Sequence, residues 1–177
     1  MKIIVIGSGY VGLVSGACFA DFGHDVVCVD TDAAKIESLN AGRIPIYEPG
    51  LEQVVASNRE AGRLIFTTDL AAHMPGAACA FLAVGTPSRR GDGHADLTYV
   101  YQAARDVARH ASGPLVVATK STVPVGTGDE VERIVRAERP DLAITVASNP
   151  EFLREGSAVE DFRRPDRIVI GANDQVS

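Results

Sequence analysis

Short, continuous apolar runs recur along the chain and alternate with longer segments whose apolar residues follow a helical spacing. Continuous apolar runs are typical of strands buried on both faces, and helical spacing is typical of helices packed on a sheet. The runs predict strands at residues 3–6, 26–29, 64–66, 77–84, 114–118, 143–147 and 167–170. Helices are predicted after the first strand, after residues 68–69, and at residues 31–40, 50–59, 96–110 and 128–137. This alternation predicts one α/β domain over residues 1–177, a doubly wound, mainly parallel sheet with helices on both faces.

The opening stretch, residues 2–30, combines a strand, a glycine-rich turn, a helix of small residues, and a second strand that ends in an acid. Gly7 allows a tight turn, Gly9 lets backbone approach a phosphate, and Gly12 lets the helix lie close to the sheet. The helix N-terminus offers free N–H groups to a pyrophosphate, and Asp30 stands where a carboxylate accepts ribose hydroxyls. Glycines at this spacing also occur in purely structural turns, but the strand, helix and acid around them favour a dinucleotide site. The acid favours NAD over NADP because it repels a 2′-phosphate.

The composition limits size, partners and location. A hydrophobic fraction of 46% over 177 residues suits one domain with a sizeable core. The net charge of −6 argues against a nucleic-acid-binding surface. The sequence contains no apolar stretch near the roughly 20 residues that a membrane span requires, and the N-terminus lacks the pattern of a signal peptide. We therefore expect a soluble, cytoplasmic protein without nucleic-acid or membrane partners.

The cysteines and histidines are interpreted as structural residues. Cys18, Cys28 and Cys79 fall in the first helix, the second strand and a later strand, at no spacing typical of a metal site or redox pair. An odd number of cysteines without a secretory signal argues against a disulfide framework. The four histidines show no partner pattern. The sequence therefore predicts neither a metal site nor thiol chemistry in this chain.

Polar residues follow several predicted strands, at the edge where ligands bind in a doubly wound sheet. The Thr86 hydroxyl follows one buried strand and is a candidate cofactor contact, with a turn expected at residues 92–93. Residues 119–127 follow the next strand and are rich in hydroxyls, which suits a nicotinamide or a substrate. Helix capping by Ser121 or Thr127 is the structural alternative.

Three further features allow two interpretations each. Lys35 lies one turn past Asp30 and is either a contact to the adenosine ribose or its phosphate, or a solvated helix lysine. The apolar, proline-marked loop 44–51 either covers the core or lines a ligand cleft; its Pro49 is placed like a first-turn proline. Glu151 and Glu155 share one face if their segment is helical, and the structural alternative is an exposed helix start with acids near the dipole.

Five motifs occur in a fixed order and go beyond the opening stretch. They are GSGYVGLVSGACFADFGHDVVCVD (7–30), PIYEPGL (45–51), VGTPSRRGDGHADL (84–97), KSTVPVGT (120–127) and SNPEFLREGSAVEDFRRPDRIVIG (148–171). In this combination the chain resembles the UDP-glucose 6-dehydrogenase family of NAD-dependent nucleotide-sugar dehydrogenases over essentially its whole length. The resemblance implies a Rossmann-type NAD-binding domain. It also implies an enzyme that oxidises C6 of UDP-glucose to a carboxylate in two NAD-dependent hydride transfers, giving UDP-glucuronate.

The resemblance further implies residue roles. The residues it assigns to NAD are Gly7, Gly9, Tyr10, Val11, Gly12, Asp30, Lys35, Gly85, Thr86, Pro87, Ser121, Thr122 and Glu155. The residues it assigns to the sugar nucleotide are Glu151, Phe152, Leu153, Arg154 and Glu155. The implied catalytic residues are Thr122, Glu151 and Glu155: Glu155 with Thr122 positions a water, and Glu151 serves acid–base steps or thioester hydrolysis. Such roles fit the chemistry, because an alcohol loses a proton as hydride leaves and a thioester needs activated water.

The chain also departs from that family. The family's catalytic cysteine stands in a later FGGxCFPKD-like motif, and its oxyanion-stabilising lysine and asparagine lie on segments that this sequence does not contain. We therefore expect the NAD-binding, amino-terminal portion of a longer, homodimeric enzyme, unable to complete the oxidation alone. The alternatives are a dehydrogenase of another nucleotide sugar, such as GDP-mannose or UDP-N-acetylmannosamine, and a non-catalytic NAD-sensing module.

Overall fold

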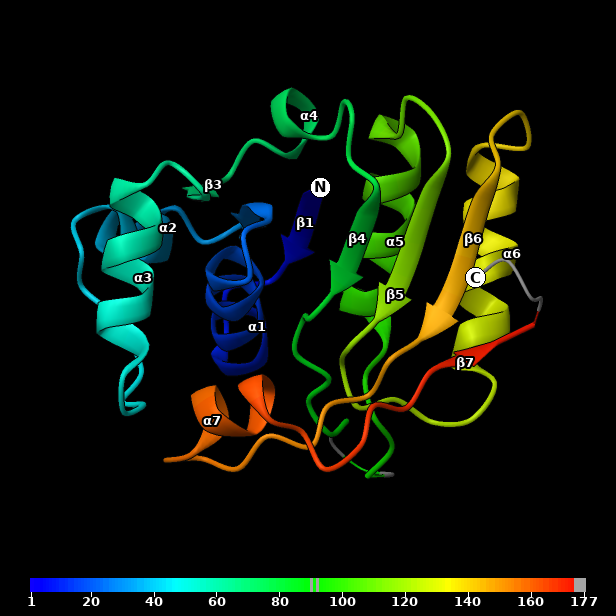
Figure 1. The fold of residues 1–177 in the computed structure, drawn as a ribbon. Coiled ribbons are helices and arrows are strands. Elements are labelled where there is room, and N and C mark those ends of the chain that lie inside the picture. The colour runs from blue at the N-terminus through cyan, green and yellow to red at the C-terminus, as the bar shows by residue number, and fades with distance from the viewer. Residues whose placement is uncertain (90, 92, 174–177) are drawn as a thin grey trace.

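The centre of the molecule is a seven-stranded sheet with the order β3-β2-β1-β4-β5-β6-β7 (Figure 1). The computed structural model describes residues 1–89, 91 and 93–173. The strands are β1 (Lys2–Ile6), β2 (Asp25–Val29), β3 (Leu64–Thr67), β4 (Cys79–Leu82), β5 (Leu115–Thr119), β6 (Ile144–Ser148) and β7 (Gly171–Ala172). Neighbours from β3 to β6 are parallel, and β7 pairs antiparallel with β6.

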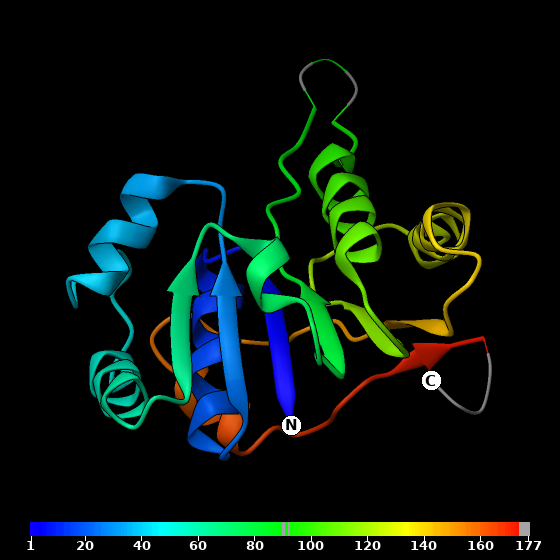
Figure 2. The same cartoon turned by 90° about the horizontal axis from the view of Figure 1, so that it is seen from above.

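Helices cover both faces of this sheet. They are α1 (Tyr10–Asp21), α2 (Ala33–Asn40), α3 (Leu51–Glu60), α4 (Leu70–His73), α5 (Thr98–His110), α6 (Thr127–Glu138) and α7 (Ala158–Arg163). One face carries α1, α3 and α7, and the other carries α5 and α6, which lie side by side in Figure 2. The expected doubly wound, mainly parallel α/β fold is confirmed. None of the described helices is both long and apolar enough to cross a membrane.

The core consists of two layers, one on each face of the sheet. Along β1, Ile3 and Val5 belong to the layer under α1, whereas Ile4 belongs to the layer under α5, and all three are buried. This alternation follows from the pleat of a strand. The strands read as unbroken apolar runs because helices cover both faces. On the α1 side the packing is close: a Cβ at Gly16 would overlap the Cys28 sulfur.

The prediction of a strand at residues 167–170 is wrong. These residues are exposed and outside any strand, and the segment that pairs with β6 is β7, which follows them. Asn149 donates its side-chain N–H to the Val169 carbonyl at 3.0 Å, which holds the run near the end of β6. A strand requires a neighbouring edge in register, and an apolar run by itself does not report one.

The helix that would place Glu151 and Glu155 on one face is also absent. Residues 151–154 are not helical, residues 155–157 form a turn, and α7 begins afterwards. Glu151 Oε2 accepts the Leu153 N–H at 2.6 Å, a side-chain bond that competes with helical pairing. Pro49 likewise precedes the N-cap of α3, which is Gly50, rather than standing in its first turn. The turn expected at residues 92–93 includes a position outside the described residues.

Candidate functional site

The strand order reverses between β1 and β4, whose carboxyl ends lie at the same edge of the sheet (Figure 1). In doubly wound sheets, ligands bind in the crevice outside such a reversal. The turn after β1 touches the end of β4, because a Cβ at Gly7 would come within 2.6 Å of the Ala83 carbonyl oxygen. Gly7 also has a φ of 98°, which side-chain-bearing residues rarely adopt. Glycine at position 7 is therefore a requirement of the turn.

The other two glycines of the turn play different steric roles. A Cβ at Gly12 would overlap the Gly7 carbonyl oxygen, whereas a Cβ at Gly9 would meet nothing within 4 Å. The expectation that Gly12 governs the distance between helix and sheet is therefore incomplete, since its nearest neighbour is the turn itself. Gly9 is the N-cap of α1 and has no side chain to accept the first N–H groups of the helix. An open space thus lies beside helix N–H groups to which the N-cap offers no side-chain acceptor, the geometry of an anion site.

Asp30 is held at the end of β2, beside this turn. Its Oδ2 accepts the Ser8 N–H and the Lys35 ammonium, each at 2.8 Å, and its Oδ1 accepts the Asp32 N–H at 3.0 Å. Burial alone would raise the pKa of Asp30, but the bonds from Lys35, Asp32 and Ser8 outweigh it and lower that pKa. The structure therefore presents a fixed, charged carboxylate. Lys35 is not simply solvated, because it pairs with Asp30.

Two predicted residues meet between the ends of β4 and β5. The Thr86 hydroxyl donates to the Thr122 carbonyl oxygen at 3.1 Å, although the residues are 36 apart in the sequence. Gly85 and Pro87 are exposed on either side of Thr86, and the Thr122 side chain is also exposed. Thr86 and Thr122 are thus brought together at the edge that carries the glycine turn.

Neither Ser121 nor Thr127 caps α6 with its side chain, so that alternative is wrong. The N-cap of α6 is a glycine, residue 126. Ser121 is buried and donates its hydroxyl to the Val84 carbonyl at 2.6 Å, and Thr127 donates to the Pro124 carbonyl at 2.7 Å. Both hydroxyls therefore stabilise loops at the carboxyl edge.

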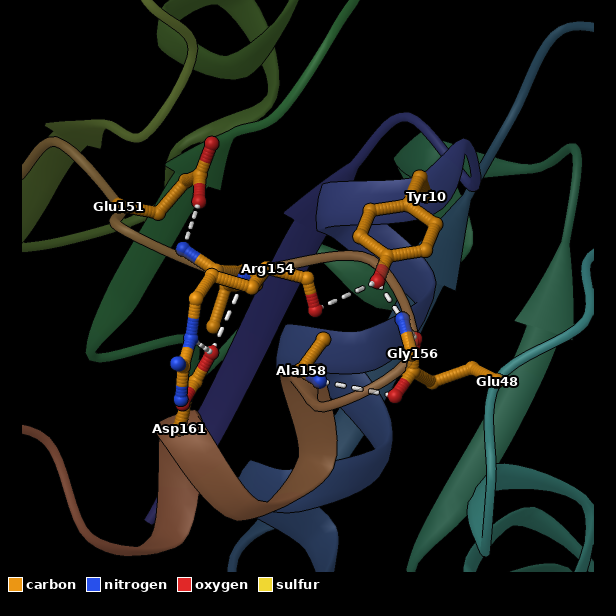
Figure 3. Close-up of polar contacts among 8 residues, drawn as sticks. Tyr10, Glu48, Glu151, Arg154, Gly156, Ala158 and Asp161 are labelled. Carbon is orange, nitrogen blue, oxygen red and sulfur yellow. Dashed lines mark hydrogen bonds and ion pairs between the residues drawn. The ribbon is translucent and has the colours of Figure 1, made fainter.

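The loop after β6 carries the predicted substrate residues. Glu151 and Leu153 are half-buried, whereas Phe152, Arg154 and Glu155 are exposed. Arg154 forms a two-pronged ion pair with Asp161 of α7, with its Nη2 at 2.6 Å and its Nε at 3.1 Å from the carboxylate (Figure 3). This pair holds the loop against α7 from the solvent side.

Glu48 is a site residue that sequence reasoning missed. Only 5% of its surface is exposed, and it accepts the Tyr10 hydroxyl at 2.6 Å and the N–H groups of Gly156 and Ala158 at 2.8 Å each (Figure 3). Around it, loop 44–51 packs its two isoleucines against the core, so the loop acts as a cover. The available signal was a single acid inside an apolar, proline-marked loop, because such an acid needs buried partners.

Lys120 is a second buried charge near the predicted residues. Its ammonium donates to the Asn149 side-chain oxygen at 3.2 Å and lies 5.5 Å from the Phe162 ring centroid. Burial lowers its pKa, although the nearby Glu151 charge opposes the shift. Lys120 lines a cavity of about 730 Å³ on the α7 side, together with Phe81 and residues of the loop after β6. The bond between Lys120 and Asn149 ties the ends of β5 and β6 together.

The cysteines are poor nucleophiles in this environment. Cys18 and Cys28 are buried, and Cys79 is half-buried. Burial raises the pKa of all three thiols to about 12. At neutral pH they are protonated, so none supplies the thiolate that nucleophilic catalysis requires.

A family model described as the UDP-glucose/GDP-mannose dehydrogenase family, NAD binding domain, matches residues 1–177. The chain belongs to this family. A UDP-glucose 6-dehydrogenase of Rhizobium meliloti is 67% identical over 173 residues, which is 98% of this chain and 40% of that relative. The chain therefore spans about 40% of the length of the curated relatives it matches.

Solved structures of the family share the fold. A UDP-glucose dehydrogenase from Pyrobaculum islandicum aligns with a TM-score of 0.93 at 47% identity, covering 99% of this chain and 41% of that one. A GDP-mannose dehydrogenase from Pseudomonas aeruginosa aligns with a TM-score of 0.93 at 37% identity, covering 99% and 42%. The backbone is thus shared between family members whose names specify different sugars.

NAD is the cofactor of this domain family, and the residues present fit it. The open space at Gly9 lies beside the first N–H groups of α1, which would hold a pyrophosphate. Asp30 follows the second strand, where a carboxylate would accept ribose hydroxyls. The buried Ser8 hydroxyl beside the turn has no partner among the described residues, which leaves it available to a ligand.

Proposed function

We propose that this chain is the NAD-binding portion of a UDP-glucose 6-dehydrogenase, which oxidises C6 of UDP-glucose to give UDP-glucuronate. The observation that carries the proposal is one sheet edge that joins a dinucleotide turn to a loop with two carboxylates. Tyr10 of the turn and Arg154 of that loop are in contact, with the tyrosine hydroxyl 3.4 Å from the Arg154 carbonyl oxygen. The 67% identity to a UDP-glucose 6-dehydrogenase favours this sugar.

The proposed roles divide between the two ends of this edge. Residues 7–12 hold the pyrophosphate through backbone N–H groups, and Asp30 with Lys35 holds the adenosine ribose. Bound NAD⁺ supplies the hydride acceptor. One carboxylate oxygen of Glu151 accepts the Leu153 N–H, and the other serves in general acid–base catalysis.

At the substrate end, we propose that Thr122 and Glu155 position a water molecule for the reaction. Both side chains are exposed at the carboxyl edge, which suits contact with a bound molecule. The remaining loop residues Phe152, Leu153 and Arg154 border the sugar nucleotide, and Gly85, Thr86, Pro87 and Ser121 border the nicotinamide end.

We further propose that the chain binds NAD⁺ but forms no UDP-glucuronate by itself. Its cysteines are protonated at neutral pH, so it lacks the thiolate that the family's chemistry uses. Isothermal titration calorimetry should show NAD⁺ binding and NADP⁺ binding weaker by about tenfold or more, because Asp30 repels a 2′-phosphate. Equal affinity for the two cofactors would contradict the role of Asp30, and UDP-glucuronate formed by this chain alone would overturn the second proposal.

A dehydrogenase of another nucleotide sugar is the second candidate. The GDP-mannose enzyme of Pseudomonas aeruginosa matches the backbone as well as the UDP-glucose enzyme of Pyrobaculum islandicum does, at lower identity. A substrate panel with the full-length enzyme separates them: UDP-glucose should be oxidised fastest, and faster oxidation of GDP-mannose would favour the alternative. A non-catalytic NAD sensor would oxidise neither.

The assembly and location expected from the sequence also stay proposals. A homodimer of the full-length enzyme would appear in sedimentation equilibrium as twice the chain mass, and a monomer would contradict it. Cell fractionation should recover the enzyme in the cytoplasmic fraction, without nucleic acid, and recovery with membranes would contradict that location.

A further inference from the structure

Glu48 joins three segments that are far apart in the sequence. Its carboxylate is bonded to Tyr10, 38 residues away, to Gly156, 108 residues away, and to Ala158, 110 residues away. Figure 3 shows Tyr10, Gly156 and Ala158 converging on this one side chain. We propose that Glu48 is a positioning residue that fastens the loop carrying Glu155 to the first turn of the dinucleotide helix. The proposal rests on the proposed function for the role of Glu155.

Two of the three bonds of Glu48 act at or beside a residue with a proposed role. The Gly156 N–H belongs to the same planar peptide unit as the Glu155 carbonyl, so fixing that N–H fixes the backbone of Glu155. Tyr10 is the first residue of α1, whose N–H groups face the open space at Gly9. One carboxylate therefore links the cofactor turn to the proposed catalytic loop, beside the longer contact of 3.4 Å between the Tyr10 hydroxyl and the Arg154 carbonyl oxygen.

The burial and charge of Glu48 make this connection stiff. A carboxylate with 5% of its surface exposed is costly unless its oxygens are bonded. Here Oε2 accepts two donors and Oε1 accepts a third, and such bonds to a charged acceptor are stronger than neutral ones. Burial alone would raise the pKa of Glu48, but Tyr10 and the loop N–H groups outweigh it and lower that pKa. The side chain is thus ionised at neutral pH.

Two other contacts show what Glu48 adds. On the solvent side, the loop is held by Arg154 and Asp161, but the Arg154 side chain is 78% exposed. An exposed pair of this kind contributes little and is screened by salt. Glu151 accepts the Leu153 N–H, a bond within its own loop. Among these contacts Glu48 is the buried one that reaches from the loop to the cofactor turn.

The first experiment uses hydrogen exchange in this chain with the isosteric variant Glu48→Gln. Losing the charge should speed exchange at the amides of Gly156 and Ala158 by about tenfold or more, since bonds to a charged acceptor are lost. Exchange in β5 should stay unchanged. The control is Glu52→Gln, an exposed glutamate in the first turn of α3, which should change neither. Unchanged exchange at residues 156 and 158, or an equal rise in β5, would overturn the positioning role.

The variant Glu48→Asp keeps the charge but shortens the reach by one methylene. If Glu48→Gln does not fold, Glu48→Asp should still fold because it keeps the charge. Its amide at residue 156 should exchange faster than in the parent chain, because the shorter side chain does not reach that N–H. Protection equal to the parent chain would show that charge alone suffices, and would contradict a role that depends on reach.

The second experiment measures turnover of the full-length enzyme. With Glu48→Gln we expect kcat to fall by about tenfold or more while KM for NAD⁺ stays within about threefold, because a displaced catalytic group costs rate more than binding. A rise in KM without loss of kcat would overturn the proposal. If the parent chain fails to bind NAD⁺, the proposed function fails, whereas the exchange experiment still decides whether Glu48 holds the loop.

Discussion

Two regions of the carboxyl edge are built in different ways. In the first, the glycine turn and Asp30 are joined by bonds within one β1-α1-β2 unit, such as that between Ser8 and Asp30, 22 residues apart. In the second, the loop after β6 is anchored on Glu48, 108 residues away from Gly156. The first region is nearly complete once a single supersecondary unit forms. The second exists only when the whole sheet has assembled.

The two regions also differ in their central carboxylates. Asp30 is partly open to solvent and pairs with the cation of Lys35, whose side chain is 30% exposed. Glu48 is buried and accepts neutral donors, namely the Tyr10 hydroxyl and the N–H groups of Gly156 and Ala158. Both carboxylates accept three donors, but Asp30 stays partly open at the edge that carries the glycine turn, whereas Glu48 is buried and joins separate segments of the fold. This difference separates ligand-facing from positioning acids.

The largest loss of stability is expected from Gly12→Ala in the first region. Its Cβ would overlap the Gly7 carbonyl oxygen, so we expect a loss of about 3 kcal/mol or more in the free energy of unfolding by urea. Gly9→Ala is the matched control, because its Cβ meets nothing within 4 Å. It should cost less than about 1 kcal/mol yet weaken NAD⁺ binding by about tenfold, measured by calorimetry. Intact NAD⁺ affinity in Gly9→Ala would argue against a pyrophosphate at this space.

Glu48→Gln tests the second region through pH. At neutral pH we expect a loss of about 2 kcal/mol in the free energy of unfolding. The pKa of Glu48 in the folded protein lies below the ordinary glutamate value of 4.5, so its ionisation stabilises the fold above that pH. This contribution is lost as the pH falls through the folded pKa.

The difference between parent and variant should therefore shrink below pH 4.5, measured by urea unfolding across pH. Tyr10 stays protonated throughout, since burial and the Glu48 bond raise its pKa. Glu155, the other charge facing Tyr10, is common to both proteins. A difference that is constant with pH would mean that the charge of Glu48 is not what stabilises the loop.

Asp30→Asn should have a smaller effect on stability and a clear effect on the cofactor. We expect a loss of about 1 kcal/mol in unfolding free energy, because the ion pair with Lys35 is partly exposed. NAD⁺ affinity should fall by about tenfold and discrimination against NADP⁺ should narrow. Asp25→Asn, an exposed position on β2, is the control and should leave both unchanged. If Asp30→Asn keeps the same preference for NAD⁺ over NADP⁺, residues other than Asp30 determine that preference.

Glu155→Gln should have the smallest effect on stability. The side chain is exposed, so we expect less than about 0.5 kcal/mol of change in the free energy of unfolding. In the full-length enzyme, turnover should nevertheless fall by about a hundredfold if Glu155 acts in acid–base chemistry. Normal turnover would remove Glu155 from the proposed mechanism and leave the loop with Glu151 alone.

The sequence determined the fold class and the first region. Strands appear as apolar runs because both faces of the sheet are covered, and Gly12 and Asp30 are identifiable because their nearest partners lie within one local unit. Gly7 is identifiable from the glycine spacing alone, since its close neighbour is Ala83 at the end of β4. The family motifs also located the loop after β6 correctly along the chain, although not its backbone conformation. These features depend on the spacing of residues that are near one another in the chain, and that spacing can be read directly from the sequence.

The tertiary structure alone decided the rest. Residues 167–170 look like a strand in isolation, but only residues 171–172 find an edge to pair with. The sequence allows loop 44–51, which contains Glu48, to be either a cover or part of a cleft. The partners of Glu48 at residues 10, 156 and 158 converge only when α7 packs against α1. A buried carboxylate is recognised by the donors around it, and the chain brings those donors together from three separate segments only on folding.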